Sequence, residues 1–256
     1  MNNKLENAKN LYLKGIRDGK LEAVDLYTGN SYTQHSTGVK DGVEGFKEFF
    51  KDFLNRTRTR DIRIIRSIQD GKYVFLHVYQ NIDNKKAEWI TTDMFLTDDN
   101  DKLIEHWDVI SKYINTDKTK SGYDPIFGDF IISDIDKTEE NKSIIKSFLI
   151  EIHQNKKFEE LEKYISIDSY IEHSVSIKNG FENFKAFLLN NDVTYDNIFH
   201  IMGEGNYVVS YSKVKINNSS LAVFDIYRLE NGKIVEHWDN VEEIPSIEEQ
   251  ANSGKF

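Results

Sequence analysis

One long stretch of the chain occurs twice, and this duplication constrains the fold more than any other feature. LIEHWDVI at 103–110 returns as IVEHWDNV at 234–241, and YTQHSTGVKDGVEGFKEFF at 32–50 returns as YIEHSVSIKNGFENFKAFL at 170–188. TDMFLTDDNDKLIEHWD at 92–108 likewise aligns with FDIYRLENGKIVEHWD at 224–239. The repeating unit exceeds roughly 100 residues, far more than one turn of a solenoid. The sequence therefore predicts two whole domains that arose by duplication.

The domain boundaries follow from the alignment of the two copies. We expect a first domain at 1–116, an interdomain connection at 117–136, a second domain at 137–248 and a tail at 249–256. The connection contains one of the two prolines and also the apolar residues Ile126, Phe127, Phe130 and Ile131. Because these side chains favour burial, we expect the connection to pack on a domain or to bridge the two.

Each copy begins with helical patterns and continues with strand patterns. Apolar residues recur at helical spacing near both starts, and a further helix at 43–54 places Phe46, Phe49, Phe50 and Phe53 on one side. Runs such as DIRIIRSI, KYVFLHVY, EWITTDMFL and KLIEHWDVI follow, joined by turns short enough for hairpins. Helices followed by an antiparallel sheet predict an α+β fold in each copy. Such a sheet curls around its helices and leaves a cavity at the wide end.

Composition and charge exclude several classes of protein. The net charge is −10, which disfavours binding to nucleic acid or to an anionic membrane surface. No apolar run is long enough to span a membrane, and the polar N-terminus lacks a signal-peptide core, so we expect a cytoplasmic protein. The absence of cysteine excludes disulfides, thiolate nucleophiles and cysteine-ligated metals. Five arginines at 55–66 have no counterpart in the second copy, and we interpret them as a solvated strand face.

The repeated EHWD motif supplies candidate functional residues. Side chains alternate across a strand, so His106 and Asp108 share one face while Glu105 and Trp107 share the other. Asp93 lies on the preceding strand, and a hairpin between the two strands lets Asp93, His106 and Asp108 converge. The second copy offers the corresponding residues Asp225, His237 and Asp239, and the YxxHS motifs contribute His35 and His173.

A histidine and two carboxylates in an apolar cavity suit proton transfer. Histidine titrates near neutral pH, and a carboxyl group in an apolar pocket can stay protonated and donate a hydrogen bond to a developing enolate. The alternative is a purely structural role, in which these histidines only supply hydrogen bonds to other buried polar groups. A metal site built from His35, His106 and either Asp93 or Asp108 is conceivable, but the spacing matches no metal motif. We therefore expect no metal and no cofactor.

Both copies resemble SnoaL-like domains of the NTF2-like superfamily, which are cone-shaped α+β domains. The motifs that carry the resemblance are Tyr32-x-x-His35-Ser36, Asp93-Met94-Phe95 and LIEHWDVI, together with YIEHS and DIYRLENGKIVEHWD in the second copy. The whole chain is similar to a two-domain form described as SnoaL-like aldol-condensation enzymes. The resemblance implies a cofactor-independent isomerase, cyclase or aldol-lyase. The superfamily also contains non-catalytic ligand binders, and an interaction scaffold with filled cones is a third possibility.

The resemblance also implies roles for individual residues. The oxyanion-stabilising aspartate of ketosteroid isomerases matches Asp225 well and Asp93 less well, and their first-helix tyrosine aligns with Tyr12. At the position of their general-base aspartate this chain has His35 and His173, so that mechanism does not transfer. In polyketide cyclases an aspartate is the general acid/base, a role open to Asp93 or Asp108.

The two copies differ in the residues available to bind a substrate. His77 in the first copy is replaced by Tyr211 in the second. If only one site works, we favour the first. We expect substrate contacts from Tyr12, His77, Phe95, Tyr211 and Tyr227. Isolated domains of this type often pair through the outer sheet face, so we expect an intrachain pseudo-dimer that binds a small molecule, with a homodimer also possible.

Overall fold

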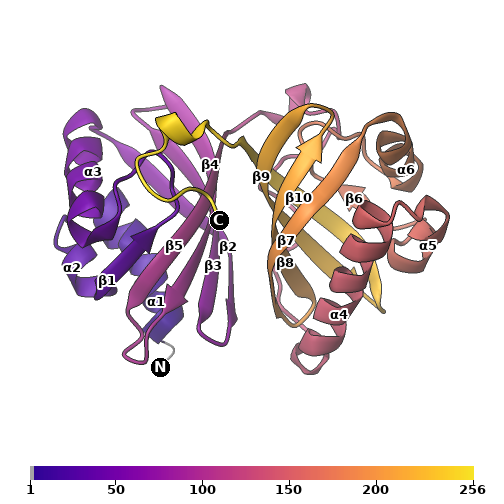
Figure 1. Ribbon diagram of the computed structural model, residues 1–256, viewed down its shortest axis with the longest axis horizontal. Coiled ribbons are helices and arrows are strands. Elements are labelled where there is room, and N and C mark those ends of the chain that lie inside the picture. The colour runs from indigo at the N-terminus through magenta and orange to yellow at the C-terminus, as the bar shows by residue number, and fades with distance from the viewer. Residues whose placement is uncertain (1–2) are drawn as a thin grey trace. The chain divides into compact units, whose positions relative to one another are not determined.

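The computed structural model describes residues 3–256 and divides them into two compact units (Figure 1). Unit 1 comprises Met1–Tyr113 with Ile244–Phe256, and unit 2 comprises Ile114–Glu243. Each unit contains a five-stranded sheet with helices, and the strands follow the same order in both sheets. The α+β class predicted from the sequence is confirmed, and the matching sheets agree with a duplication.

Unit 1 begins with helices and ends with a four-stranded meander. Its elements are α1 (Asn3–Asn10), the π-helical segment η1 (Leu11–Arg17), α2 (Ala23–Tyr27), β1 (Thr28–Gln34), α3 (Gly42–Arg56), β2 (Arg60–Asp70), β3 (Tyr73–Ile82), β4 (Ala87–Thr97) and β5 (Leu103–Lys112). The strand order is β1-β5-β4-β3-β2, and every pairing is antiparallel except that of β1 with β5. The short strand β1 was not predicted, because TGNSYTQ has no Val, Ile, Leu or Phe, and its Thr and Tyr residues are mixed with Gly, Asn, Ser and Gln.

Unit 2 repeats this arrangement with shorter helices. Its elements are the 3₁₀ turns η2 (Thr116–Lys118) and η3 (Ile135–Lys137), α4 (Thr138–Phe148), the π-helical segment η4 (Leu149–Gln154), η5 (Phe158–Glu160), α5 (Leu161–Tyr164), β6 (Ile171–Glu172), α6 (Phe181–Asn190), β7 (Val193–Glu204), β8 (Tyr207–Ile216), β9 (Ser219–Glu230) and β10 (Lys233–Glu243). The order is β6-β10-β9-β8-β7, with β6 parallel to β10. None of the described helices in either unit has the length and apolar character needed to cross a bilayer.

The segments that flank the two sheets pack on single units. The connection predicted at 117–136 belongs to unit 2, where the Trp238 indole N–H donates to the Phe127 carbonyl at 2.7 Å. Of its four apolar side chains only Ile126 is buried, whereas those of Phe127, Phe130 and Ile131 are exposed, so the expectation of burial was wrong for these three. The segment Ile244–Phe256, which includes the 3₁₀ turn η6 (Ile247–Glu249), belongs to unit 1 although it follows unit 2 in the sequence. We call Ile244–Phe256 the closing segment.

The helices of unit 1 cover one face of its sheet because their apolar residues recur at helical spacing. In α3 the rings of Phe46 and Phe50 are buried and join the core with residues of α1, η1 and the sheet. The α3 side chains Phe49 and Phe53 line a cavity that remains between the helices and the sheet. The spacing of the phenylalanines thus serves both the core and the cavity wall.

Candidate active site

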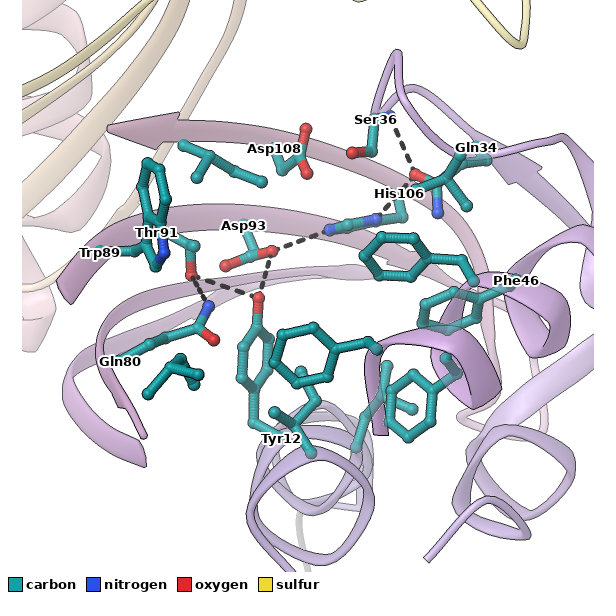
Figure 2. Close-up of a pocket in the computed structure, with 18 of the residues that line it drawn as sticks. Tyr12, Gln34, Ser36, Phe46, Gln80, Trp89, Thr91, Asp93, His106 and Asp108 are labelled. Atoms are coloured by element: carbon teal, nitrogen blue, oxygen red, sulfur yellow. Dashed lines mark hydrogen bonds and ion pairs between the residues drawn. The ribbon is translucent and has the colours of Figure 1, made fainter. Parts of the chain in front are cut away.

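A cavity of about 410 Å³ lies inside unit 1 (Figure 2). Its helical wall is mostly aromatic and aliphatic, whereas β4 and β5 supply most of its ionisable groups. The polar lining residues are Tyr12, Gln34, Ser36, Arg56, Thr57, Gln80, Thr91, Asp93, His106 and Asp108. A largely apolar cavity with a few convergent polar groups is the usual form of a small-molecule site.

Asp93 is almost completely buried, at 1% exposure. One carboxylate oxygen, Oδ1, accepts a hydrogen bond from the Tyr12 hydroxyl at 2.7 Å and lies 2.9 Å from His106 Nε2. The other oxygen, Oδ2, is buried and has no hydrogen-bond partner among the described residues. A buried, unpartnered carboxylate oxygen is costly, so its presence beside a cavity marks Asp93 as a candidate reactive group.

The hydrogen bonds of His106 define where its protons lie. Gln34 Oε1 accepts the backbone N–H of Ser36 at 2.9 Å, and His106 Nδ1 lies 2.9 Å from the same oxygen. The oxygen can only accept, so Nδ1 carries a hydrogen and Nε2 faces Asp93. A hydrogen bond between His106 Nε2 and Asp93 Oδ1 then requires one proton, carried either by Nε2 of an imidazolium or by the carboxyl group of a neutral pair.

Asp108 lies directly opposite Asp93 in the β4–β5 register and is held by a cation. Lys255 Nζ, from the closing segment, lies 2.9 Å from Asp108 Oδ1. Burial opposes ionisation of this carboxyl group, but the Lys255 ammonium and His106 outweigh it and lower the pKa of Asp108 below its usual value.

Asp93, His106 and Asp108 are thus brought together, as their positions on adjacent strands implied, but His35 lies elsewhere. In the parallel β1–β5 ladder Gln34 pairs with His106, so Gln34 shares the cavity face and His35 points to the other face. There the His35 ring stacks on Trp107 with centroids 5.0 Å apart, and its Nε2 lies 3.0 Å from Glu105.

The other substrate-contact candidates of unit 1 divide between cavity and core. Tyr12 and Phe95 line the cavity, and the Phe95 ring stacks on His106 with centroids 4.5 Å apart. His77 is buried and does not line the cavity; its Nδ1 lies 3.3 Å from Arg66 Nη1. Sequence reasoning missed Gln34, although alternation along YTQH would have placed it beside His106 had β1 been recognised.

The equivalent aspartate of unit 2 has partners on both oxygens. Asp225 Oδ2 accepts the hydroxyls of Tyr195 at 3.0 Å and Ser210 at 3.2 Å, and Oδ1 lies 3.2 Å from His237 Nε2. Glu172 replaces Gln34, so His237 Nδ1 faces a carboxylate at 2.9 Å. Burial disfavours a charged imidazole, but Glu172 and Asp225 outweigh this and raise the pKa of His237 well above its usual value. This histidine is a fixed cation rather than one partner of a shared proton.

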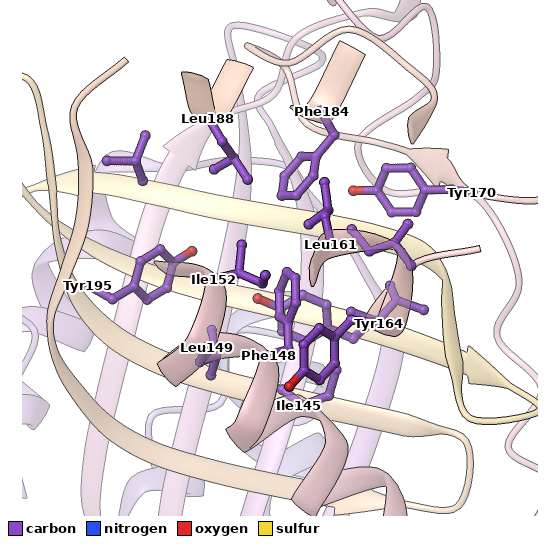
Figure 3. Packing of buried hydrophobic residues seen from close by; sticks show 14 of the residues in the cluster. Ile145, Phe148, Leu149, Ile152, Leu161, Tyr164, Tyr170, Phe184, Leu188 and Tyr195 are labelled. Carbon is purple, nitrogen blue, oxygen red and sulfur yellow. The ribbon is translucent and has the colours of Figure 1, made fainter. Parts of the chain in front are cut away.

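In the interior of unit 2, buried apolar side chains from its helices and its sheet pack into one cluster (Figure 3). The π-helical segments of the two units end at equivalent backbone hydrogen bonds, from Asp18 N to Leu13 O and from Asn155 N to Ile150 O. These bonds align the two segments residue by residue. By this alignment Leu149 replaces Tyr12, Ile152 replaces Gly15 and His153 replaces Ile16, all three being buried. The added Ile152 side chain and the Tyr195 ring pack in the core of unit 2.

The remaining candidates of unit 2 lie in different environments, and only Tyr227 belongs to this core cluster. Asp239 Oδ2 accepts the Ser174 hydroxyl at 2.8 Å, and although the residue keeps slight exposure, burial raises the pKa of Asp239 to about 7. Tyr227 is buried and stacks on the His237 ring, whereas Tyr211 stacks on Phe224.

His173 repeats the arrangement of His35 on the outer face of the sheet. Its ring stacks on Trp238, its Nδ1 donates to the Asp124 carbonyl at 2.8 Å, and its Nε2 lies 2.8 Å from Glu236.

The metal site considered from the sequence included His35. Because His35 lies on the outer face of its sheet, it is not part of the group of described residues that could hold a metal ion. That group is Asp93, His106 and Asp108, whose ligand atoms lie within 4.8 Å of one another. A metal there would have to displace Asp93 from His106 and compete with Lys255 for Asp108.

Comparison with known proteins places similarity at the level of fold. No protein-family model matches the chain, and no curated protein matches it. Similar solved structures include a candidate polyketide cyclase from Bacillus cereus, 18% identical, which covers 43% of this chain and 74% of its own at a TM-score of 0.39. An NTF2-like protein of unknown function from Cytophaga hutchinsonii is 16% identical, with coverages of 45% and 95% and a TM-score of 0.37. An LEH-like epoxide hydrolase from M. tuberculosis is 15% identical, with coverages of 43% and 83% and a TM-score of 0.36. The reaction is therefore argued from the geometry of the site.

Proposed function

We propose that the unit 1 cavity is an active site that moves a proton next to the carbonyl group of a small, mostly apolar molecule, without a cofactor. The observation that carries this proposal is the buried Asp93–His106 pair, with its 2.9 Å contact and one unpartnered carboxylate oxygen at a cavity. Such a pair provides a base and an acid in one site, which is what proton removal and return require.

The proposed reaction begins with Asp93 as a carboxylate and His106 as an imidazolium. Asp93 Oδ2 takes a proton from the carbon beside the substrate carbonyl: the C–H bond breaks, an O–H bond forms and the electron pair moves into an enolate. The imidazolium and the Tyr12 hydroxyl, both next to Asp93, stabilise the negative charge that develops. Return of the proton to a carbon of the enolate completes an isomerisation. Alternatively, attack of the enolate on a second carbonyl forms a C–C bond and an alkoxide, which takes the proton back from Asp93 and completes an aldol-type ring closure.

The lining supports a neutral substrate. Aromatic and aliphatic side chains of α3, η1 and the sheet form most of the wall, including Phe46, Phe50 and Phe95. The cations next to these carboxylates, His106 and Lys255, are already paired with Asp93 and Asp108, which disfavours binding of an anionic group there. The volume of about 410 Å³ lies within the range of pockets that enclose drug-sized molecules. A ketone or polycyclic ketone fits these constraints better than a phosphate ester or a carboxylic acid.

The test is deuterium exchange at the carbon beside the carbonyl. The protein is incubated in D₂O with a panel of ketones, and deuterium uptake is followed by NMR. Asp93→Asn removes the base and is expected to lower the catalysed exchange about 100-fold or more. Asp225→Asn is the matched control in unit 2 and is expected to retain exchange. Equal exchange in the wild type and Asp93→Asn refutes the proposal. Tight binding of a ketone without any exchange would favour the non-catalytic binder.

A further inference from the structure

Lys255 is a buried lysine that reaches the candidate active site from a distant part of the sequence. It is 2% exposed, and its Nζ contacts both Oδ1 of Asp108 at 2.9 Å and the Asp108 carbonyl at 3.0 Å. Lysine is almost never fully buried unless it is paired, because removing its charge from water is costly. The pairing with a cavity-lining carboxylate is therefore a built feature of unit 1.

Backbone hydrogen bonds hold the closing segment in this place. Ala251 N donates to the Thr37 carbonyl at 2.8 Å, and the Asn252 side-chain amide donates to the carbonyls of Ser36 and Val39. The carbonyl of Gly254 accepts His35 Nδ1–H at 2.7 Å, which gives this histidine a role outside the cavity. Gly254 has φ +101°, a conformation that favours glycine, so the turn immediately before Lys255 is specifically shaped.

Unit 2 has the same aspartate without the lysine. Asp239 pairs with Asp225 in the β9–β10 register as Asp108 pairs with Asp93. The equivalent serines, Ser174 and Ser36, each hydrogen-bond the aspartate of their own unit, so the lysine is the difference between the two sites. The carbonyl that accepts the outer-face histidine of unit 2 belongs to Asp124, and the residue after it is Pro125, which carries no charge. The duplication therefore provides a natural comparison of one aspartate with and without a buried ammonium.

We propose that Lys255 is a positioning residue of the unit 1 site, whose ammonium keeps Asp108 ionised and fixed so that the Asp93–His106 pair holds the only mobile proton. This inference rests on the proposed function of the pair. Two carboxylates this close otherwise tend to share a proton, because like charges disfavour the ionisation of both. With Lys255 and an imidazolium present, two cations balance two carboxylates, and no second proton competes for Asp93.

The groups around Asp108 support this role. Its titratable neighbours are Lys255, His106, Asp93 and the phenols of Tyr12 and Tyr32. Only the first two can carry a positive charge. The pKa values of the two equivalent aspartates shift in opposite directions. The pKa of Asp108, beside Lys255, is lowered, whereas burial raises the pKa of Asp239, which has no such lysine, to about 7.

The primary test needs no substrate. Aspartate side-chain carboxyl resonances are titrated by ¹³C NMR in the wild type, Lys255→Met, Lys255→Arg and the exposed-lysine control Lys118→Met. In Lys255→Met the Asp108 titration is expected to move up, toward the value of about 7 for Asp239, while the Asp239 titration stays in place. Lys255→Arg and the control are expected to keep Asp108 as in the wild type. An unchanged Asp108 titration in Lys255→Met overturns the proposal.

A second measurement separates positioning from simple structural support. In the ketone exchange assay, Lys255→Met is expected to shift the acid limb of the pH profile to higher pH. At pH values above that limb, the variant is expected to retain most of the wild-type rate. An equal loss at every pH, not restored by Lys255→Arg, assigns Lys255 a structural role only and refutes positioning. If Lys255→Met does not fold, Lys255→Gln removes the same charge with a similar side-chain length.

The two proposals can fail separately. If Asp93→Asn keeps full exchange, the proposed function is wrong, yet the NMR titration still reports whether Lys255 sets the ionisation of Asp108. If exchange depends on Asp93 but Asp108 titrates alike in every variant, only the inference about Lys255 is wrong.

Discussion

Replacing His153 by isoleucine is expected to protect unit 2 against acid. The His153 ring is buried between aromatic rings, with centroids 4.3 Å from Tyr195 and 5.1 Å from Phe148, and its Nδ1 has no hydrogen-bond partner among the described residues. Burial, with a smaller contribution from the His237 charge, lowers the pKa of His153 from 6.5 to about 3. Isoleucine stands at the equivalent position of unit 1, so a similar volume is already accommodated there.

The magnitude follows from proton linkage. The unfolded chain binds a proton at this histidine below pH 6.5, whereas the folded chain binds it only near pH 3, so stability falls as the pH drops through this window. The difference of about 3.5 pKa units corresponds to about 5 kcal/mol once the pH is below both values. At about pH 5 the expected loss is about 2 kcal/mol relative to neutral pH.

Urea unfolding at about pH 7.5 and about pH 5 measures this effect. The indole N–H resonance of Trp238, the tryptophan of unit 2, reports this unit separately from unit 1. The wild type is expected to lose about 2 kcal/mol more than His153→Ile between the two pH values. A difference between the two proteins of less than about 0.5 kcal/mol would show that burial of this ring does not exclude its proton.

Two further predictions concern the cavity of unit 1. Tyr12→Phe removes the hydroxyl that, in the proposed reaction, stabilises the negative charge developing on the enolate. Loss of about 1.5 kcal/mol or more of this stabilisation is expected to slow ketone exchange about tenfold or more. Tyr195→Phe removes the matching hydroxyl in unit 2 and should leave exchange unchanged. Gly15→Ala places a methyl group 2.7 Å from the ring of Phe50, which lines the cavity, so we expect this ring to shift into the cavity. Ligand affinity, measured by calorimetry, is then expected to fall. Unchanged affinity would show that the ring moves in another direction.

Some features of this protein follow from the sequence alone because they depend on local geometry. The repeat predicted two domains of one class, and the helix and strand periodicities predicted α+β, which the structure confirms. Alternation along LIEHWDVI placed His106 and Asp108 on one face, and the short turn before it placed Asp93 on the neighbouring strand. The residues of the proposed proton pair were therefore identifiable without coordinates.

Other features depend on which strands and segments become neighbours. The polar strand β1 is stabilised by its parallel pairing with β5, and the register of that pairing sends Gln34 to the cavity and His35 to the outer face. No local pattern encodes such a pairing, because its hydrogen bonds join residues about 70 positions apart. The contact of Lys255 with Asp108 spans an even longer separation.

The difference between the two interiors is likewise a property of packing. Both copies carry the same aspartate, histidine and aspartate, but Tyr195 and Ser210 satisfy Asp225, whereas Asp93 keeps an unpartnered oxygen beside a cavity. The sequence determined which ionisable residues each copy holds. Only the tertiary structure decided which carboxylate oxygen has no hydrogen-bond partner, because this depends on how side chains from several helices and strands pack around the aspartate.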